Sequence, residues 1–172
     1  GNPVVKTPHL DDMAGKGVRF DYFYPGGAVC SPGRYSILTG RTPFRGGLHY
    51  LGGIPPHEIT VAKALKTAGY RTAHFGKWHL GICPLKMGFD QAIWSSNCYD
   101  APGFPLYVND TKEIHKLKDG DTSVTMMDLA LDCIRQHAKE PEPFFVQVCF
   151  SAPHSPANAT PEFKALYKDG NN

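Results

Sequence analysis

Cys30 and Arg34 are the two side chains in this sequence best placed to do chemistry together. They lie at the start of a predicted helix that runs to about Leu38. Residues four apart share one face of a helix, and the first turn offers free backbone N–H groups with partial positive charge. Arg34 adds a planar, permanently charged donor. A nucleophile beside an anion site is what sulfuryl or phosphoryl transfer requires. The alternative is that Cys30 is a small buried apolar residue.

Lys77 and His79 form a second candidate pair after a strand predicted from Tyr70 to Phe75. In extended backbone, residues two apart point the same way, so Trp78 would point to the opposite side. A cation and an imidazole on one face suit an anionic substrate that also needs a proton moved. The alternative is a strand end with solvated polar residues.

His154 is the third candidate, because it follows a strand predicted over residues 143–150. In doubly wound α/β proteins, active groups collect just past the carboxyl ends of strands. The alternative is an ordinary polar residue on a surface loop.

Three segments resemble the signatures of the type I sulfatases. The first family signature is Cys-x-Pro-Ser-Arg-x-x-x-Leu-Thr-Gly-Arg, and the sequence departs from it at Gly33, where the family usually has serine. The positions that match are Cys30, Pro32, Arg34, Leu38, Thr39, Gly40 and Arg41. Residues 69–81, centred on Gly-Lys-Trp-His, look like the second signature, and residues 153–156 resemble the Pro-His-x-Pro pattern.

The resemblance implies an α/β fold like that of alkaline phosphatase, with a largely parallel central sheet flanked by helices. It identifies residues 1–172 as a partial sulfatase catalytic domain, with the first strand and the C-terminal part absent. The implied activity is removal of sulfate from an organic sulfate ester, with Cys30 oxidised to formylglycine (3-oxoalanine). The implied location is extracytoplasmic: secreted, periplasmic or lysosomal.

The resemblance also assigns roles to individual residues. Cys30, as formylglycine, is the nucleophile and a metal ligand, and Arg34 steadies it. Lys77 and His154 hold sulfate oxygens, while His79 takes a proton so that sulfate can leave. Arg41, roughly 10 Å along the helix from Arg34, is a supporting residue.

The family also holds a divalent cation, normally Ca²⁺, with aspartate pairs that are expected to be absent from this chain. Asp11 and Asp12 are rejected as substitutes. Leu10, Met13 and Ala14 are spaced for the buried stripe of a helix over residues 8–15, which leaves both aspartates in water.

Two other functions stay open. A phosphonate or phosphate ester hydrolase could use the same aldehyde, and a chain without metal ligands could be an inactive or merely binding domain. The expected partners are a sulfated small molecule or glycan and a formylglycine-generating enzyme. Specificity is expected from residues 42–56 and 82–121.

The composition of the chain bears on which kinds of partner it can bind. The net charge of +2 over 172 residues gives no strong attraction to nucleic acid or membrane, and no apolar run approaches membrane-spanning length. Of five cysteines, the four other than Cys30 allow two disulfides or none.

The remaining pattern predicts the elements that position these groups. Alternating strands and helices indicate a parallel sheet covered by helices. We expect a strand over residues 18–24, a helix from Thr60 to Thr67, irregular structure over residues 81–121 and a last short helix from Pro161. A helix is expected over residues 123–138, with a buried stripe of Val124, Met127, Ala130, Leu131 and Ile134.

Overall fold

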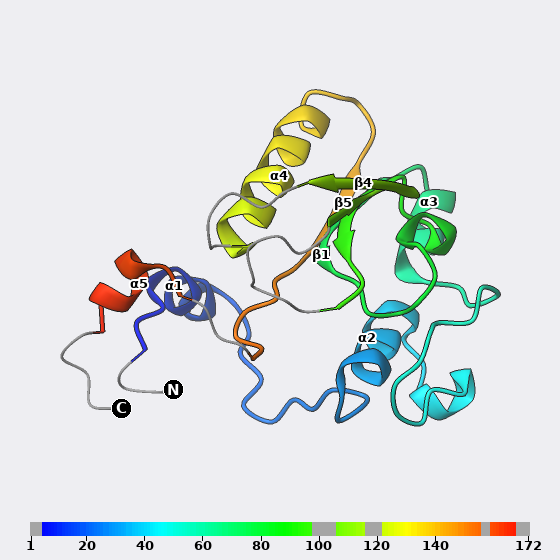
Figure 1. The fold of residues 1–172 in the computed structure, drawn as a ribbon, viewed down its shortest axis with the longest axis horizontal. Helices are drawn as coiled ribbons and strands as arrows, with labels where there is room; N and C mark the ends of the chain where they lie inside the picture. Colours follow the sequence, from blue (N-terminus) through cyan, green and yellow to red (C-terminus); the bar gives the residue numbers. More distant parts are fainter. Residues whose placement is uncertain (1–4, 98–105, 116–121, 156–158, 168–172) are drawn as a thin grey trace. The chain divides into compact units, whose positions relative to one another are not determined.

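The structure, a computed structural model, describes residues 5–97, 106–115, 122–155 and 159–167 (Figure 1). The chain divides into two compact units. The first unit joins Gly1–Tyr24 with Pro161–Asn172, and the second unit is Pro25–Thr160. All candidate site residues belong to the second unit.

The first unit contains two short helices, α1 (Pro8–Lys16) and α5 (Pro161–Ala165). The α1 helix forms as predicted, but its expected buried stripe is wrong, because Leu10 and Met13 are 59% and 63% exposed. Neither helix has a buried residue, so the expected stripe is not covered by the described residues. Asp12 forms an ion pair with Lys16 across 2.8 Å, as expected for a wet helix face.

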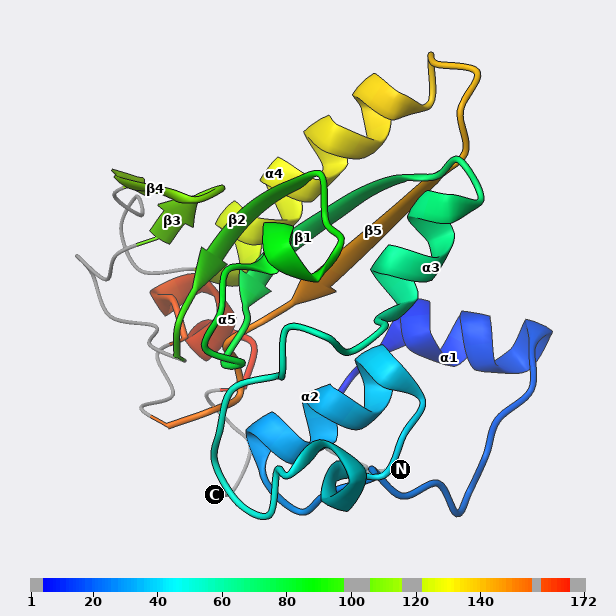
Figure 2. The same cartoon turned by 90° about the vertical axis from the view of Figure 1, so that its right-hand side faces the viewer.

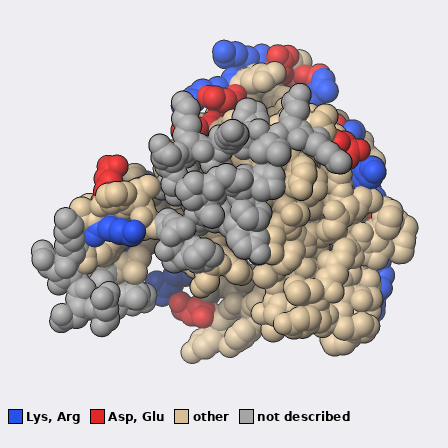
Figure 3. All heavy atoms as spheres, in the orientation of Figure 1, with Lys and Arg blue, Asp and Glu red and all other residues tan. Residues whose placement is uncertain are grey.

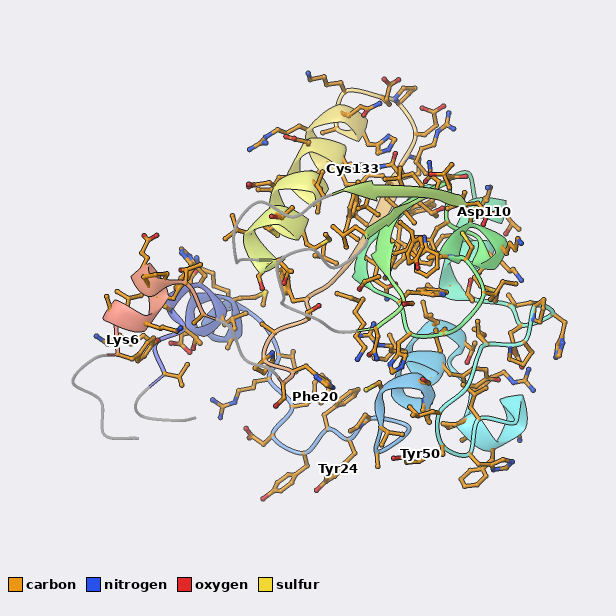
Figure 4. The ribbon with its side chains drawn as sticks, viewed as in Figure 1. Lys6, Phe20, Tyr24, Tyr50, Asp110 and Cys133 are labelled. Carbon is orange, nitrogen blue, oxygen red and sulfur yellow. The ribbon has the colours of Figure 1, made fainter. Side chains whose placement is uncertain are left out.

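The predicted strand over residues 18–24 does not form. A strand needs a hydrogen-bonding neighbour, and all strands of the described sheet belong to the second unit. Figure 4 shows Phe20 and Tyr24 projecting from this segment, and both rings are largely exposed.

A five-stranded sheet is the centre of the second unit, with the order β4-β3-β2-β1-β5. The strands are β1 (Arg71–Lys77), β2 (Gln91–Ser95), β3 (Leu106–Val108), β4 (Thr111–His115) and β5 (Phe144–Cys149). The β1 strand pairs in parallel with β2 and β5, whereas the β2–β3 and β3–β4 pairings are antiparallel. The predicted α/β class is confirmed, with parallel pairing on both sides of β1 and short antiparallel pairings toward the β4 edge.

The expectation of irregular structure over residues 81–121 is therefore wrong in part. Strands β2, β3 and β4 lie in this stretch, together with the short 3-10 helix η2 (Pro84–Met87). Each strand is short, and two of them pair through a tight turn at Asn109 and Asp110. Short strands rich in polar residues carry little periodic signal.

Helices cover both faces of the sheet. The α2 (Cys30–Thr39) and α3 (Val61–Thr67) helices lie on the opposite side of β1 and β5 from α4 (Thr122–His137), as Figure 2 shows. Alternate residues of β1 serve the two faces, because Ala73 and Phe75 pack under α4 while the His74 ring contacts Trp78 in the other core cluster. The 3-10 helix η1 (Pro43–Gly46) follows α2.

The predicted helix over residues 123–138 is confirmed as α4, but its buried stripe is rotated by about one residue. The buried residues are Thr122, Met126, Ala130 and Cys133. Val124, expected inside, is exposed. Apolar residues flank the true stripe on both sides, so the sequence leaves the rotation of this helix open. Figure 3 shows charged side chains of both signs gathered over the C-terminal end of α4 and the turn after it.

Gly76 holds the C-terminal ends of β1 and β5 together. Its φ is +101°, and a Cβ at this position would collide with the carbonyl oxygen of Cys149, its partner in the parallel register. Only glycine accepts both the conformation and the close approach. The loops that carry His79 and His154 therefore leave the sheet from neighbouring strand ends.

Candidate active site

The start of α2 presents Cys30 and Arg34 from a well-packed base. Val29 is the extended N-cap residue, so Cys30 is the first residue of the helix. Cys30 and Arg34 are partly exposed, whereas Ser31, between them, is buried. A Cβ on Gly27 would collide with Pro32, because the loop before the helix folds back onto its first turn. The first turn of α2 is therefore fixed with its candidate side chains accessible.

Two hydrogen bonds tie this turn to the chain that follows β1. The Nη1 of Arg34 donates to the carbonyl oxygen of Lys77 at 2.6 Å, and the hydroxyl of Ser31 donates to the carbonyl oxygen of His79 at 2.9 Å. The first and second sequence signatures thus meet in space, joined through residues of both.

The expected extended geometry of residues 77–79 is wrong. The β1 strand ends at Lys77, and His79 is left-handed with φ of +55°. Trp78 is buried, and its indole N–H donates to the carbonyl oxygen of Ile82 at 2.6 Å. The backbone turns at His79 because the chain must close around Trp78 rather than continue along the sheet.

The electrostatic surroundings of His79 bring four predicted groups together. Burial lowers the pKa of His79 most, and the positive charges of Lys77, Arg34 and His154 lower it further. Its Nδ1 is buried without a hydrogen-bond partner among the described residues. The imidazole is therefore neutral at neutral pH and sits among cations, where it can accept a proton.

His154 is exposed on the loop after β5, as the sequence predicts. Its Nδ1 lies 2.7 Å from the carbonyl oxygen of Ser155. Because a carbonyl only accepts, Nδ1 carries the proton in the neutral ring and Nε2 is left open. Arg41 is placed differently: its guanidinium pairs with Glu58 at 2.8 Å beyond the C-terminal end of α2.

Sequence reasoning missed a buried polar pair beneath Arg34. His74 and Gln147 are partners in the parallel register of β1 and β5, and the Nδ1 of His74 donates to the Gln147 amide oxygen at 3.1 Å. Burial lowers the pKa of His74 to about 4. A cavity of about 140 Å³ lies here, lined by both residues, Arg34 and Cys149 among others. The sequence signal that could have indicated this pair is a polar residue in the middle of each of the two predicted strands.

The described residues do not fit the Ca²⁺ that the family implies. Nowhere among them do three or more His, Cys, Asp or Glu side chains gather as a metal site. Asp11 and Asp12 are exposed. Their carboxylates accept hydrogen bonds from Thr7 and Lys16 respectively. Within the same residues, no helix combines the length and apolar character needed to cross a bilayer.

Four cysteines are free thiols: Cys30, Cys83, Cys133 and Cys149. Cys98 lies outside the described residues. Burial raises the pKa of the Cys133 thiol, and Gln91 donates to its sulfur at 3.0 Å. Figure 4 shows Cys133 on α4.

Comparison with known proteins identifies the family of the chain. The family model described as Sulfatase matches residues 1–172. N-acetylgalactosamine-6-sulfatase of Rattus norvegicus is 38% identical over 199 residues, covering 95% of this chain and 38% of that protein. The ulvan-active sulfatase of Formosa agariphila is 34% identical over 180 residues, covering 97% of this chain and 34% of that protein. The chain thus spans little more than a third of each relative.

The fold is also shared with solved structures. The crystal structure of Ps i-CgsB in complex with k-i-k-neocarrahexaose superposes with a TM-score of 0.91 at 24% identity, over 100% of this chain and 45% of that chain. This likeness supports the predicted alkaline-phosphatase-like architecture. With the family match over the whole sequence, it leads to one assignment: the chain belongs to the sulfatase family.

Proposed function

We propose that the protein hydrolyses sulfate esters and that these 172 residues supply its nucleophile and anion-binding side chains. The observation that carries the proposal is the joining of Arg34, Lys77 and His79 at the start of α2 by side-chain-to-carbonyl hydrogen bonds. The cations suit a sulfate group, and the lowered pKa of His79 leaves a base at neutral pH. Membership of the sulfatase family supports sulfate over phosphonate or phosphate esters.

We infer that residue 30 works as formylglycine, whose hydrated aldehyde supplies an oxygen nucleophile. Arg34 steadies that group from the next turn of the helix. Lys77 and His154 hold sulfate oxygens, and Nε2 is the ring nitrogen of His154 that is open to them. His79 takes the proton that must be removed as sulfate leaves.

We propose a sulfated glycan as the substrate. The names of the similar proteins support a sugar: one relative is an N-acetylgalactosamine-6-sulfatase, another is ulvan-active, and the similar structure holds a neocarrahexaose. The corresponding partners are that glycan and a formylglycine-generating enzyme. An extracytoplasmic location belongs to the same proposal.

We assign the rim of the site to residues 42–56. The N–H of Ile54 donates to the carbonyl oxygen of Leu80 at 2.9 Å, which ties this segment to the loop after His79. Tyr50, labelled in Figure 4, is 66% exposed on it. Exposed aromatic rings on a fixed segment suit the apolar face of a sugar ring.

The test uses the intact protein and two substrates. An aryl sulfate should be hydrolysed far faster than an aryl phosphonate diester, whereas the reverse order would favour the phosphonate hydrolase. Mass spectrometry of the tryptic peptide containing Cys30 should show a loss of about 18 Da, or almost none for the hydrate. An unmodified thiol from a host that carries the maturing enzyme, without hydrolysis of either substrate, would leave an inactive or binding domain.

A further inference from the structure

We propose that Glu58 is a positioning residue for the reaction, and that it acts by fixing the rotation of α2. The proposal rests on the proposed function, because α2 carries Cys30 and Arg34. Glu58 lies outside all three sequence signatures, in the loop before α3, and it touches none of the groups assigned to the substrate.

One carboxylate grips the helix at two places. Oε1 accepts a hydrogen bond from the hydroxyl of Tyr35 at 2.8 Å, and Oε2 accepts one from the guanidinium of Arg41 at 2.8 Å. Tyr35 follows Arg34 directly, and Arg41 lies just beyond the left-handed cap residue Gly40. Two attachment points on one rigid group oppose both rotation and sliding of the helix.

The carboxylate and its Tyr35 partner are buried, whereas the Arg41 side chain is 45% exposed. The Glu58 side chain is 1% exposed, and Tyr35 is fully buried. A buried carboxylate is costly unless its oxygens are satisfied, and here both oxygens accept from donors on the α2 segment. Burial and the Glu58 carboxylate raise the pKa of Tyr35, so its hydroxyl keeps the proton that it donates.

The loop that carries Glu58 is itself anchored. The Glu58 N–H donates to the carbonyl oxygen of Pro55 at 3.1 Å, and the ammonium of Lys63 on α3 donates to the Glu58 carbonyl oxygen at 2.8 Å. A fixed loop is what allows the carboxylate to hold α2, rather than to move with it.

The contact between Glu58 and α2 lies close to the nucleophile along the helix. Tyr35 is five residues from Cys30, which is about 7.5 Å along a helix. The first turn is held separately by Arg34 and Ser31 through the carbonyl oxygens of Lys77 and His79. Releasing the far end allows the helix to rock about these two bonds. A displacement of about 1 Å at the nucleophile can cost roughly 100-fold in rate.

Glu58→Gln and Tyr35→Phe test the proposal in the intact protein. The glutamine keeps an acceptor for Tyr35 but turns a donor toward Arg41, whereas the phenylalanine removes only one hydroxyl. Glu142→Gln is the matched control, because Glu142 forms an exposed ion pair with Arg71 at 3.5 Å. Rates on an aryl sulfate are measured well below the melting temperature of each variant. They are divided by the fraction of residue 30 found as formylglycine.

Both variants should lose about 10-fold or more in kcat with KM unchanged within about twofold, since the sulfate-binding cations remain. The double variant should lose no more than the worse single variant, and the control should match the wild type. A merely structural role predicts lower melting temperatures with an unchanged kcat, and that result would overturn the proposal. If Glu58→Gln does not fold, Tyr35→Phe decides. A wild-type protein without sulfate hydrolysis would instead refute the proposed function itself.

Discussion

Arg34 and Lys77 meet through the backbone, because the Nη1 of Arg34 lies 2.6 Å from the Lys77 carbonyl oxygen. This bond uses one of the five N–H donors of the guanidinium, so the group has further donors with which to bind an anion. Arg34 thus fixes α2 against the end of β1 and also contributes charge to the site.

Arg34→Lys should lower kcat/KM by about 100-fold, although the positive charge is kept. A compact ammonium cannot reach the Lys77 carbonyl and present a planar fork to an anion at once. The measurement is steady-state hydrolysis of an aryl sulfate. Arg71→Lys, at an exposed ion pair, is the control and should have wild-type kinetics. Equal activity of both variants would contradict the double role of Arg34.

His154→Gln should raise the pKa of His79. The positive charge of His154 is one of the groups that lower it, so removal relieves part of the repulsion of the imidazolium. An NMR titration of the His79 ring protons measures the shift directly, without reliance on turnover. His57→Gln, at an exposed position outside this cluster, should leave the His79 titration unchanged. An unchanged or lower pKa of His79 would show that the charge of His154 does not act on the His79 ring.

Stability should fall as the pH drops from about 6.5 to 4 because of His74. The folded-state pKa of about 4 lies below the unfolded value of 6.5. The unfolded chain therefore binds the proton first, and the stabilisation present above pH 6.5 is lost on acidification. The full effect is about 3 kcal/mol. Urea unfolding at several pH values should show it, and His74→Gln should flatten the difference. An equally steep loss in that variant would assign the effect to other groups.

Gly76→Ala should destabilise the fold by about 3 kcal/mol or more, because it combines a positive φ with a collision against the Cys149 carbonyl. Gly33→Ser is the contrasting change. A Cβ at position 33 would lie 3.4 Å from the Gly27 carbonyl oxygen, which is an ordinary contact. Thermal melts compare the two variants. A stable Gly76→Ala protein would contradict the close approach of β1 and β5.

The sequence predicted local elements well where a clear signal exists. Thr60 caps α3 by accepting from the Lys63 N–H at 3.1 Å, and β5 falls within the predicted strand. The predictions were wrong where the structure of a segment depends on another segment that packs or pairs with it. Residues 18–24 alternate like a strand but have no pairing neighbour in the described sheet, and the rotation of α4 depends on which of its flanking apolar residues meets the sheet.

The candidate site shows the same division. Its signatures identified Arg34, Lys77 and His79, which the structure brings together, while their catalytic roles remain predictions. The sequence did not predict the buried contacts of Glu58 or of His74 with Gln147, because in each case the partner lies far away in the sequence. From sequence alone, a buried carboxylate in a loop looks the same as a solvated one. The difference appears only when the position of the covering helix is known.

The bonds from Ser31 and Arg34 to the carbonyls of His79 and Lys77 span 48 and 43 residues. During synthesis at roughly 5–20 residues per second, the acceptors of these bonds appear several seconds after Cys30 has been made. Until then the first turn of α2 lacks these two bonds. In the proposed maturation, a modifying enzyme would meet Cys30 on a nascent segment that still lacks these bonds, and the later arrival of β1 would close that opportunity.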